Sequence, residues 1–349
     1  MQSLRQPGSL GLRRWVSGRH LARGISTVTK DTTIGVVGCG NVGQAVGHNL
    51  ARSGFKVVAA YDVDKTRMAS MPKAMIRVKT AKEVAERADV VVTGLPRPPD
   101  VLAAAEGPDG LLAGLGPDKV WIDHSTTDYH QTLKFSKDAE AKGAHVVEAP
   151  ITGGLEALKK GQMVVHLGGD EAVCNAVMPL LKASYHEMFY VGPIGSAMIV
   201  KVVSNMLACV NIIAMGEVLM LAKRAGIDLH KFWDAIRVSA GNSFAWETGG
   251  PTIFNGSYDP GFTMGLLCKD LQLGYDMAKD HRVPMDLHQL VLSIYRRGQY
   301  QFGDEAGCYI PPKCLEEAMG ESLNIPGFEK WVYDNEINNQ SIAVKHSNI

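Results

Sequence analysis

The chain has 349 residues, of which 46% are hydrophobic and 21% charged, and its formal net charge is zero. This length fits one large or two medium globular domains, and the balanced charge gives no global attraction for nucleic acid or a membrane surface. The 6 cysteines form neither a C-x-x-C pair nor a zinc-ligand spacing, so we expect reduced thiols, no disulfide and no metal site.

The first thirty residues differ in composition from the rest of the chain. They contain five arginines and several serines among apolar residues, and no acidic residue precedes Asp31. This composition is typical of a mitochondrial transit peptide, and the continuous apolar run of a secretory signal is missing. We therefore expect residues 1–30 to direct the chain to the mitochondrial matrix. A disordered basic tail is the alternative.

Short apolar strands alternate with amphipathic segments from Thr33 onward. Such alternation predicts a mainly parallel, doubly wound α/β sheet. A helix is expected over 41–53. Strands are expected over 34–37, 56–61, 90–95, 120–123, 145–148, 164–168 and 188–191. We assign residues 31–195 to a dinucleotide-binding domain of the Rossmann type.

Helical periodicity replaces this alternation after Gly195. Residues 196–225 form one long predicted helix that is apolar around much of its circumference, as expected of a helix buried on several sides. The charged side chains within it argue against a membrane span. Shorter helices are expected over 229–238, 266–281 and 287–297. We assign 196–325 to a helical domain for substrate binding and for assembly into a dimer or tetramer, and 326–349 to a C-terminal extension.

Gly38, Gly40 and Gly43 form a G-x-G-x-x-G sequence between the first expected strand and the first expected helix. In that setting the first glycine permits a tight turn, the second lets the backbone approach a pyrophosphate, and the third lets helix and strand pack closely. Asn41 and Val42 then open the helix, whose free N–H groups face the phosphates. The alternative is a glycine turn in a sheet protein that binds no nucleotide.

Asp62 ends the second expected strand, nineteen residues after Gly43. A carboxylate there accepts hydrogen bonds from the adenine ribose hydroxyls and repels a 2′-phosphate, so we expect NAD rather than NADP. Leu95 and Pro96 end a later strand, and we place them along the nicotinamide ribose. A proline that only ends the strand is the alternative for that pair.

Hydroxyl and glycine residues follow two of the later strands. They are Ser125, Thr126, Thr152, Gly153 and Gly154. The first two lie at the sheet edge where ligands bind in doubly wound folds. The other three combine a hydroxyl with bare backbone amides, which makes a neutral cradle for a carboxylate. The alternatives are a turn that caps the next helix and a glycine turn without a ligand.

Lys201 and Asn205 lie four residues apart on the long helix and so share one face. A lysine is rarely buried on an apolar helix unless it is paired. A lysine that pairs with a carboxylate or reaches solvent is the structural alternative. In an active site, such a lysine accepts or relays the hydroxyl proton of an alcohol substrate, and its ammonium stabilises a developing oxyanion.

These features together resemble the β-hydroxyacid dehydrogenase family. Four blocks carry the resemblance: the glycine fingerprint, a D-x-S-T sequence at 123–126, a sequence at 148–154 similar to D-A-P-V-S-G-G, and a G-x-x-G at 192–195 followed by K-x-x-x-N. Ser204 departs from the pattern, because a second asparagine is usual there. The resemblance implies a Rossmann domain joined by the long helix to an all-α domain.

The resemblance also implies an enzyme that uses NAD to oxidise a small 3-hydroxy acid. Together with mitochondrial targeting, it implies conversion of 3-hydroxyisobutyrate to methylmalonate semialdehyde in valine breakdown, with Lys201 as general acid and base. Substrate contacts are implied for Ser125, Thr126, Thr152, Gly153, Gly154 and Asn205. Thr126 and Lys269 are implied to contact the cofactor as well, with Lys269 closing over the cleft.

The sequence leaves two other functions open. An NADPH-dependent glyoxylate or succinic semialdehyde reductase has the same fold, but Asp62 argues against a 2′-phosphate. A non-catalytic dinucleotide-binding scaffold also has this fold, but it lacks the lysine that the chain has as Lys201. A decarboxylating enzyme similar to 6-phosphogluconate dehydrogenase needs added phosphate-binding basic residues, and the sequence does not single out such a set.

Overall fold

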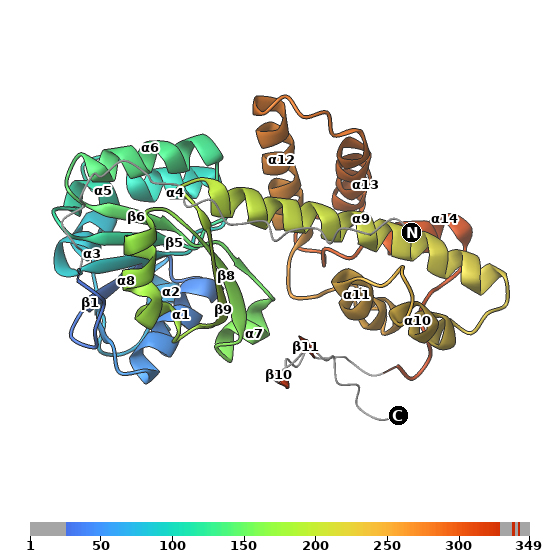
Figure 1. Cartoon of the computed structure of the whole chain (residues 1–349). Coiled ribbons are helices and arrows are strands. Elements are labelled where there is room, and N and C mark those ends of the chain that lie inside the picture. Colours follow the sequence, from blue (N-terminus) through green and yellow to red (C-terminus); the bar gives the residue numbers. More distant parts are fainter. Residues whose placement is uncertain (1–25, 329–336, 339–340, 343–349) are drawn as a thin grey trace, which may run out of the picture.

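The computed structural model describes residues 26–328, 337–338 and 341–342. Figure 1 shows a sheet covered by helices, joined through one long helix to a part built from helices alone. The expected transit peptide lies outside the described residues except for 26–30, and so does most of the expected extension 326–349.

A nine-stranded sheet forms the first part of the molecule. Its parallel strands are β1 (Thr33–Val37), β2 (Lys56–Tyr61), β3 (Ile76–Arg77), β4 (Val90–Thr93), β5 (Val120–Asp123) and β6 (His145–Glu148). Their order is β3-β2-β1-β4-β5-β6, which is the Rossmann order with its switch point between β1 and β4. The expected doubly wound sheet is therefore confirmed.

Three more strands extend the sheet beyond β6. They are β7 (Ile151–Thr152), β8 (Met163–Gly168) and β9 (Tyr185–Gly192). β8 runs antiparallel to β6 and β7 and parallel to β9. Glu148 pairs with Gly168 at the carboxyl end of β6, so β7 and β8 lie beside the sheet edge where ligands bind. A separate antiparallel pair joins β10 (Ile337–Asn338) to β11 (Ser341–Ile342).

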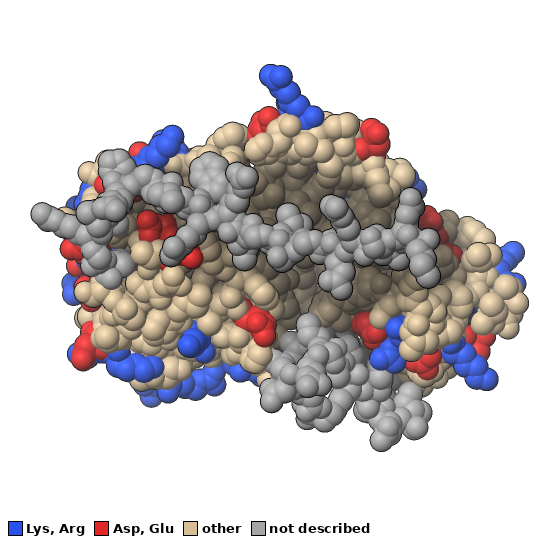
Figure 2. Space-filling view, viewed as in Figure 1, with Lys and Arg blue, Asp and Glu red and all other residues tan. Residues whose placement is uncertain are grey.

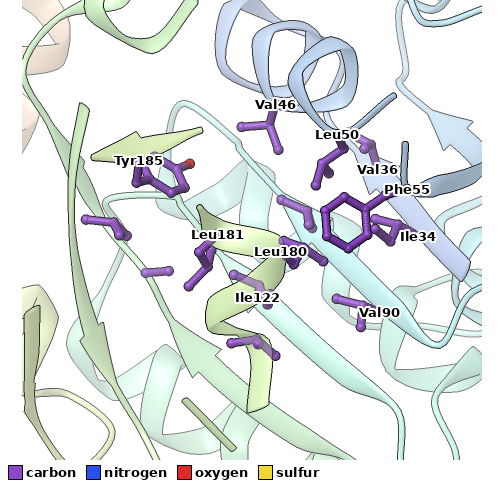
Figure 3. Packing of buried hydrophobic residues seen from close by; sticks show 14 of the residues in the cluster. Ile34, Val36, Val46, Leu50, Phe55, Val90, Ile122, Leu180, Leu181 and Tyr185 are labelled. Atoms are coloured by element: carbon purple, nitrogen blue, oxygen red, sulfur yellow. The ribbon is translucent and has the colours of Figure 1, made fainter. Parts of the chain in front are cut away.

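Helices cover both faces of the sheet (Figure 1). They are α1 (Asn41–Arg52), α2 (Lys65–Ala69), α3 (Ala81–Arg87), α4 (Pro98–Ala105), α5 (Leu111–Gly114), α6 (Tyr129–Glu140), α7 (Leu155–Lys159) and α8 (Glu171–Leu181). Alternate residues of a strand face opposite layers, so Val90 and Val92 join the core that contains α1 and α8, and Val91 joins the core that contains α3 to α6. Figure 3 shows the first of these cores, where Leu50 and Phe55 lie close to the strands.

The second part is organised around the long helix. Its helices are α9 (Ser196–Arg224), α10 (Leu229–Arg237), α11 (Phe244–Phe254), α12 (Met264–Asp280), α13 (Asp286–Phe302) and α14 (Pro311–Met319). α11, α12 and α14 pack against α9 along its length (Figure 1). Their apolar residues form a third core with those of α9.

Two helices of this part were not predicted from the sequence. α11 contains adjacent glycines, which usually weaken a helix. A Cβ on Gly249 would lie 2.4 Å from Cε of Met215, and one on Gly250 would lie 2.4 Å from Nε1 of Trp233. The glycines therefore allow α11 to pack closely on its neighbours. α14 begins at Pro311, and proline is favoured in the first turn of a helix.

α9 is the one helix among the described residues that is long and apolar enough to cross a membrane by length and composition. Core helices of globular proteins meet the same two criteria. α9 packs against all five of the other helices of this part and against β8 and β9, and it carries Lys201 with only 8% of its surface exposed. A lysine buried among polar partners is typical of a site inside a protein core.

Candidate active site

The glycine fingerprint forms the turn from β1 into α1. Gly38 has φ +88°, and a Cβ there would lie 2.7 Å from the carbonyl oxygen of Gly94. A Cβ on Gly43 would lie 1.8 Å from the carbonyl oxygen of Gly38. By contrast, a Cβ on Gly40 would meet nothing nearer than Nη1 of Arg67, 3.9 Å away. The protein itself thus requires the first and third glycines, whereas the open space over Gly40 suits a pyrophosphate.

The amino end of α1 is open toward that space. Gly40 is the N-cap residue and supplies no side-chain hydrogen bond, so the first turn, which begins with Asn41 and Val42, has no side-chain cap. An uncapped helix start presents free N–H groups to an anion. The five predicted fingerprint residues therefore lie together at the uncapped amino end of α1.

Asp62 lies at the end of β2, directly beside this turn. Its Oδ2 accepts a hydrogen bond of 2.6 Å from the backbone N–H of Cys39, and its Oδ1 accepts one of 2.8 Å from that of Asp64. These bonds orient the carboxylate next to the fingerprint. Arg67, which sequence reasoning missed, forms a 3.5 Å ion pair with Asp64 and brings a cation to the same end of the site.

Leu95 and Ser125 meet at the carboxyl ends of β4 and β5. The N–H of Leu95 donates a 2.9 Å hydrogen bond to Oγ of Ser125. Asp123, buried beneath them, accepts bonds of 2.9 Å from the N–H of Ser125 and 2.6 Å from the hydroxyl of Thr93. Burial raises the pKa of the Asp123 carboxyl, and these hydrogen bonds oppose that rise. Pro96 is exposed beyond this pair.

His124 ties two of the predicted loops together. Its Nδ1 lies 2.7 Å from the carbonyl oxygen of Ala149, and its Nε2 lies 3.0 Å from the hydroxyl of Tyr185. The ring is only 4% exposed, and this burial lowers its pKa to about 4. The loop that bears Ser125 is thereby connected to the loop that leads into Thr152.

Thr152, Gly153 and Gly154 lie together on that second loop. Thr152 pairs with Val164 between β7 and β8. The two glycines have φ values of +126° and +86°, which side-chain-bearing residues rarely adopt. A Cβ on Gly154 would lie 3.9 Å from the carbonyl oxygen of Pro260, so this loop approaches the helical part.

Lys201 lies at the start of a chain of polar contacts that runs across the helical part and back to the sheet. Its Nζ donates a 3.1 Å hydrogen bond to Oδ1 of Asn205, whose Nδ2 donates one of 2.6 Å to Oδ2 of Asp270. Lys269 pairs with Oδ1 of Asp270 at 3.0 Å. Lys269 also donates a 2.5 Å hydrogen bond to the carbonyl oxygen of Thr126. The predicted residues on α9, α12 and the β5 loop are thus brought into one site.

Burial lowers the pKa of Lys201. The negative charge of Asp270 opposes that shift, and the positive charge of Lys269 adds to it. A lysine whose pKa is lowered in this way gives up its proton more readily than an exposed lysine, which suits proton exchange with a substrate oxygen. Asp270 therefore contacts both Asn205 and Lys269 at the candidate site, and the sequence indicated it only as the neighbour of Lys269. Its position becomes clear only when α12 is packed against α9.

The site lies where the sheet meets the helical part. Figure 2 shows the molecule hollowed between these parts on the side viewed, with acidic and basic side chains interspersed around the rim. Among the described residues, no group of three or more His, Cys, Asp or Glu is arranged to hold a metal ion.

Comparison with known families covers both parts of the molecule. Residues 33–192 match the family described as the NAD binding domain of 6-phosphogluconate dehydrogenase. Residues 195–309 match the family described as the NAD-binding part of NADP-dependent 3-hydroxyisobutyrate dehydrogenase.

Individual proteins show the same similarity. The chain is 30% identical to human mitochondrial 3-hydroxyisobutyrate dehydrogenase over 309 residues, which cover 84% of this chain and 92% of the human protein. It is 29% identical to 2-(hydroxymethyl)glutarate dehydrogenase of Eubacterium barkeri over 271 residues, 77% of this chain and 90% of that protein. The structure of 3-hydroxyisobutyrate dehydrogenase from Mycobacterium tuberculosis with L-serine superposes with a TM-score of 0.76 at 27% identity, covering 82% of this chain and 99% of that one.

Proposed function

This chain belongs to the 3-hydroxyisobutyrate dehydrogenase family of hydroxyacid dehydrogenases, and we propose that it uses NAD to oxidise 3-hydroxyisobutyrate to methylmalonate semialdehyde. The observation that carries this proposal is the buried Lys201, hydrogen-bonded to Asn205 and linked through Asp270 and Lys269 to Thr126. Such a network holds one amine in place at the junction of cofactor and substrate regions.

The residues of the site suit the removal of a hydride and a proton from an alcohol. NAD, when bound, supplies the nicotinamide carbon that accepts the hydride. Thr152 and the amides of Gly153 and Gly154 bind the substrate carboxylate. Lys201 in its neutral form takes the proton from the hydroxyl oxygen, and in the reverse direction its ammonium returns that proton. Asn205 orients the Lys201 amine toward the substrate hydroxyl by accepting a hydrogen bond from it.

The proposed cofactor preference rests on Asp62 at the end of β2. Asp62 is oriented by two backbone N–H groups beside the glycine fingerprint. In Rossmann folds the end of this strand is where the adenosine ribose is bound. A carboxylate there accepts the ribose 2′-hydroxyl hydrogen bond and repels a 2′-phosphate. We propose NAD for this reason.

Location and assembly extend the proposal. The basic, serine-bearing first thirty residues support import into the mitochondrial matrix. Leu207 and Leu221 of α9 are 61% and 69% exposed, and apolar side chains exposed along a central helix favour a homo-oligomer. The pathway that fits such an enzyme is valine breakdown.

A second candidate is an NADPH-dependent reductase of glyoxylate or succinic semialdehyde. Arg67 favours it, because its guanidinium lies at the adenosine end of the site and could pair with a 2′-phosphate. The ion pair with Asp64 already engages this guanidinium, and Asp62 is the better-buried charge there. We therefore rank this candidate second.

A steady-state assay of the mature chain tests the proposal. NAD and NADP are each offered with 3-hydroxyisobutyrate, 3-hydroxypropionate, glycerate and serine, and NADPH is offered with glyoxylate and succinic semialdehyde. NAD-linked turnover of 3-hydroxyisobutyrate that falls by at least ~10²-fold in Lys201→Ala is the expected result. Turnover confined to NADPH and the aldehydes would establish the second candidate instead. Cofactor binding without any turnover would indicate a non-catalytic scaffold.

A further inference from the structure

A carboxylate from the sheet caps the helix that carries Lys201. Oε1 of Glu148 accepts a 2.7 Å hydrogen bond from the N–H of Ala197, and Oε2 accepts one of 3.3 Å from the N–H of Met198. Gly195, the N-cap residue of α9, has no side chain and forms no side-chain cap. The start of α9 is therefore capped by a residue 49 positions earlier in the chain.

The surroundings of Glu148 are shaped around its side chain. It is only 1% exposed. A Cβ on Gly168 of β8 would lie 2.1 Å from Oε1 of Glu148, so the side chain passes through the space that a residue larger than glycine would occupy. Three elements, β6, β8 and α9, thus meet at this one carboxylate.

The position of this contact bears on the chemistry. Lys201 lies three residues beyond Met198, which is about 4.5 Å along the helix axis. On the other side, the strand that ends at Glu148 continues directly into Thr152, Gly153 and Gly154. One residue therefore connects the helix of the amine to the loop of the carboxylate cradle.

We propose that Glu148 is a positioning residue for Lys201, fixing the start of α9 on β6 and so setting where the amine lies relative to the carboxylate cradle. This inference rests on the proposed function, since it assigns both groups to one substrate. Glu148 itself does not contact the reacting atoms. A shorter or uncharged side chain would leave the helix start unanchored or shifted.

Two variants of Glu148 and one matched control test the idea. Glu148→Asp keeps the carboxyl group but is one methylene too short, and Glu148→Gln keeps the length and one acceptor oxygen. Asp170→Asn is the control, because Asp170 caps the neighbouring helix α8 through the N–H groups of Ala172 and Val173, at 2.8 and 3.2 Å. This control removes the charge from a helix cap of the same kind and keeps the accepting oxygen. The helix that it caps does not carry Lys201.

The expected result is a loss of kcat of roughly 10- to 100-fold in Glu148→Asp, because a misplaced catalytic group is costly. Glu148→Gln should lose less. KM for the hydroxy acid and Kd for NAD should stay near their wild-type values, and the primary deuterium isotope effect on kcat should rise, since hydride transfer becomes slower. Asp170→Asn should keep the wild-type values of all four quantities.

Backbone hydrogen exchange of residues 197–201 gives a second readout that needs no turnover. Exchange there should be faster in Glu148→Asp and unchanged in Asp170→Asn. A wild-type kcat and isotope effect in Glu148→Asp would overturn the inference, as would equal kinetic losses in Asp170→Asn. If Glu148→Asp does not fold, Glu148→Gln decides by the same measurements. A wild-type protein without turnover on any substrate would instead overturn the proposed function, leaving hydrogen exchange to decide on the cap.

Discussion

The hydroxyl of Tyr185 on β9 lies 3.0 Å from Nε2 of His124, and both side chains are buried. Nδ1 of the same ring faces the carbonyl oxygen of Ala149 at 2.7 Å, and a carbonyl oxygen only accepts, so Nδ1 carries a proton. The lowered pKa of about 4 keeps the ring neutral at pH 7, with Nε2 accepting from the Tyr185 hydroxyl. The neutral imidazole connects the ends of β5 and β6 through these bonds. Protonation of His124 at Nε2 would break the hydrogen bond from Tyr185 and would place a positive charge in a buried site. Both changes are unfavourable.

We predict that His124 makes the protein sensitive to acid. Burial lowers the pKa of His124 from 6.5 to about 4. Between these values the unfolded chain binds a proton that the folded chain does not, so stability falls as pH drops from 6.5 toward 4. His124→Asn should be less stable than wild type at pH 7. That difference should shrink by about 2 to 3 kcal/mol at pH 4.5, because the variant lacks this proton uptake.

Urea unfolding at pH 7 and pH 4.5 measures this difference. Exposed His48→Asn is the control for the exchange of histidine for asparagine at a position that is not buried. Tyr185→Phe should lose stability at both pH values while keeping the acid sensitivity of His124. A His124→Asn difference that stays constant between the two pH values would contradict the assignment.

The two charged partners of Lys201 should shift its titration in opposite directions. Asp270 raises the pKa of Lys201 and Lys269 lowers it. In the oxidation direction the neutral amine accepts the proton, so kcat/KM rises with pH through this pKa. Asp270→Asn should move that rise to lower pH, and Lys269→Met should move it to higher pH. Each variant should also lose about 10-fold or more in kcat/KM, because each breaks a contact of the network.

The pH profiles of kcat/KM for the wild type and both variants test this. Shifts in the same direction, or none, would show that the titrating group is not Lys201. Asp276→Asn is a suitable control, because Asp276 is on the same helix but is bonded to Gln272 at the surface. Its profile should match that of the wild type.

Asp62 should set the preference between the two dinucleotides. Asp62→Ser removes the charge that repels a 2′-phosphate while keeping an acceptor near Cys39 and Asp64. We expect the ratio of kcat/KM for NAD to that for NADP to fall at least ~10-fold, or about 1.4 kcal/mol. Arg67→Gln should weaken binding of NADP to that variant. An unchanged ratio in Asp62→Ser would show that the ribose does not reach this carboxylate.

Residues that lie close together in the sequence could be predicted from local patterns. Long-range contacts could be predicted only through the family resemblance, as for Lys269 and Thr126, or not at all. The fingerprint glycines lie within six residues of each other, and Lys201 and Asn205 are one helical turn apart, so periodicity alone places them together. Glu148 meets α9 across 49 residues, and Asn205 meets Asp270 across 65. Such contacts depend on how β6, α9 and α12 pack, which no local pattern specifies.

The same reasoning explains why one helix, α11, and two short strands, β3 and β7, could not be predicted from the sequence. Glycine and proline near 250 reduce helix propensity by about 1 and about 3 kcal/mol respectively, so α11 could not be recognised from propensity. Its packing against Met215 and Trp233 offsets that cost. The strands β3 and β7 have two residues each and are too short to show alternation.

The glycines of the fingerprint should separate stability from cofactor binding. A Cβ on Gly43 would lie 1.8 Å from the carbonyl oxygen of Gly38, a contact with backbone that cannot move aside cheaply. Gly43→Ala should therefore lower the free energy of unfolding by about 2 kcal/mol or more and abolish NAD binding. Gly40 has φ −73° and open space around it, so Gly40→Ala should fold with near wild-type stability.

Gly40→Ala should nevertheless bind NAD at least ~10-fold more weakly, because the added methyl group occupies the path of the pyrophosphate toward the amino end of α1. Thermal unfolding without cofactor and titration of NAD by fluorescence measure the two effects separately. Gly54→Ala is not a suitable control, since Gly54 has φ +80° and would be strained. Gly116→Ala is suitable, because nothing lies within 4 Å of its Cβ position and its φ lies outside the left-handed region. Wild-type NAD affinity in Gly40→Ala would contradict the placement of the pyrophosphate.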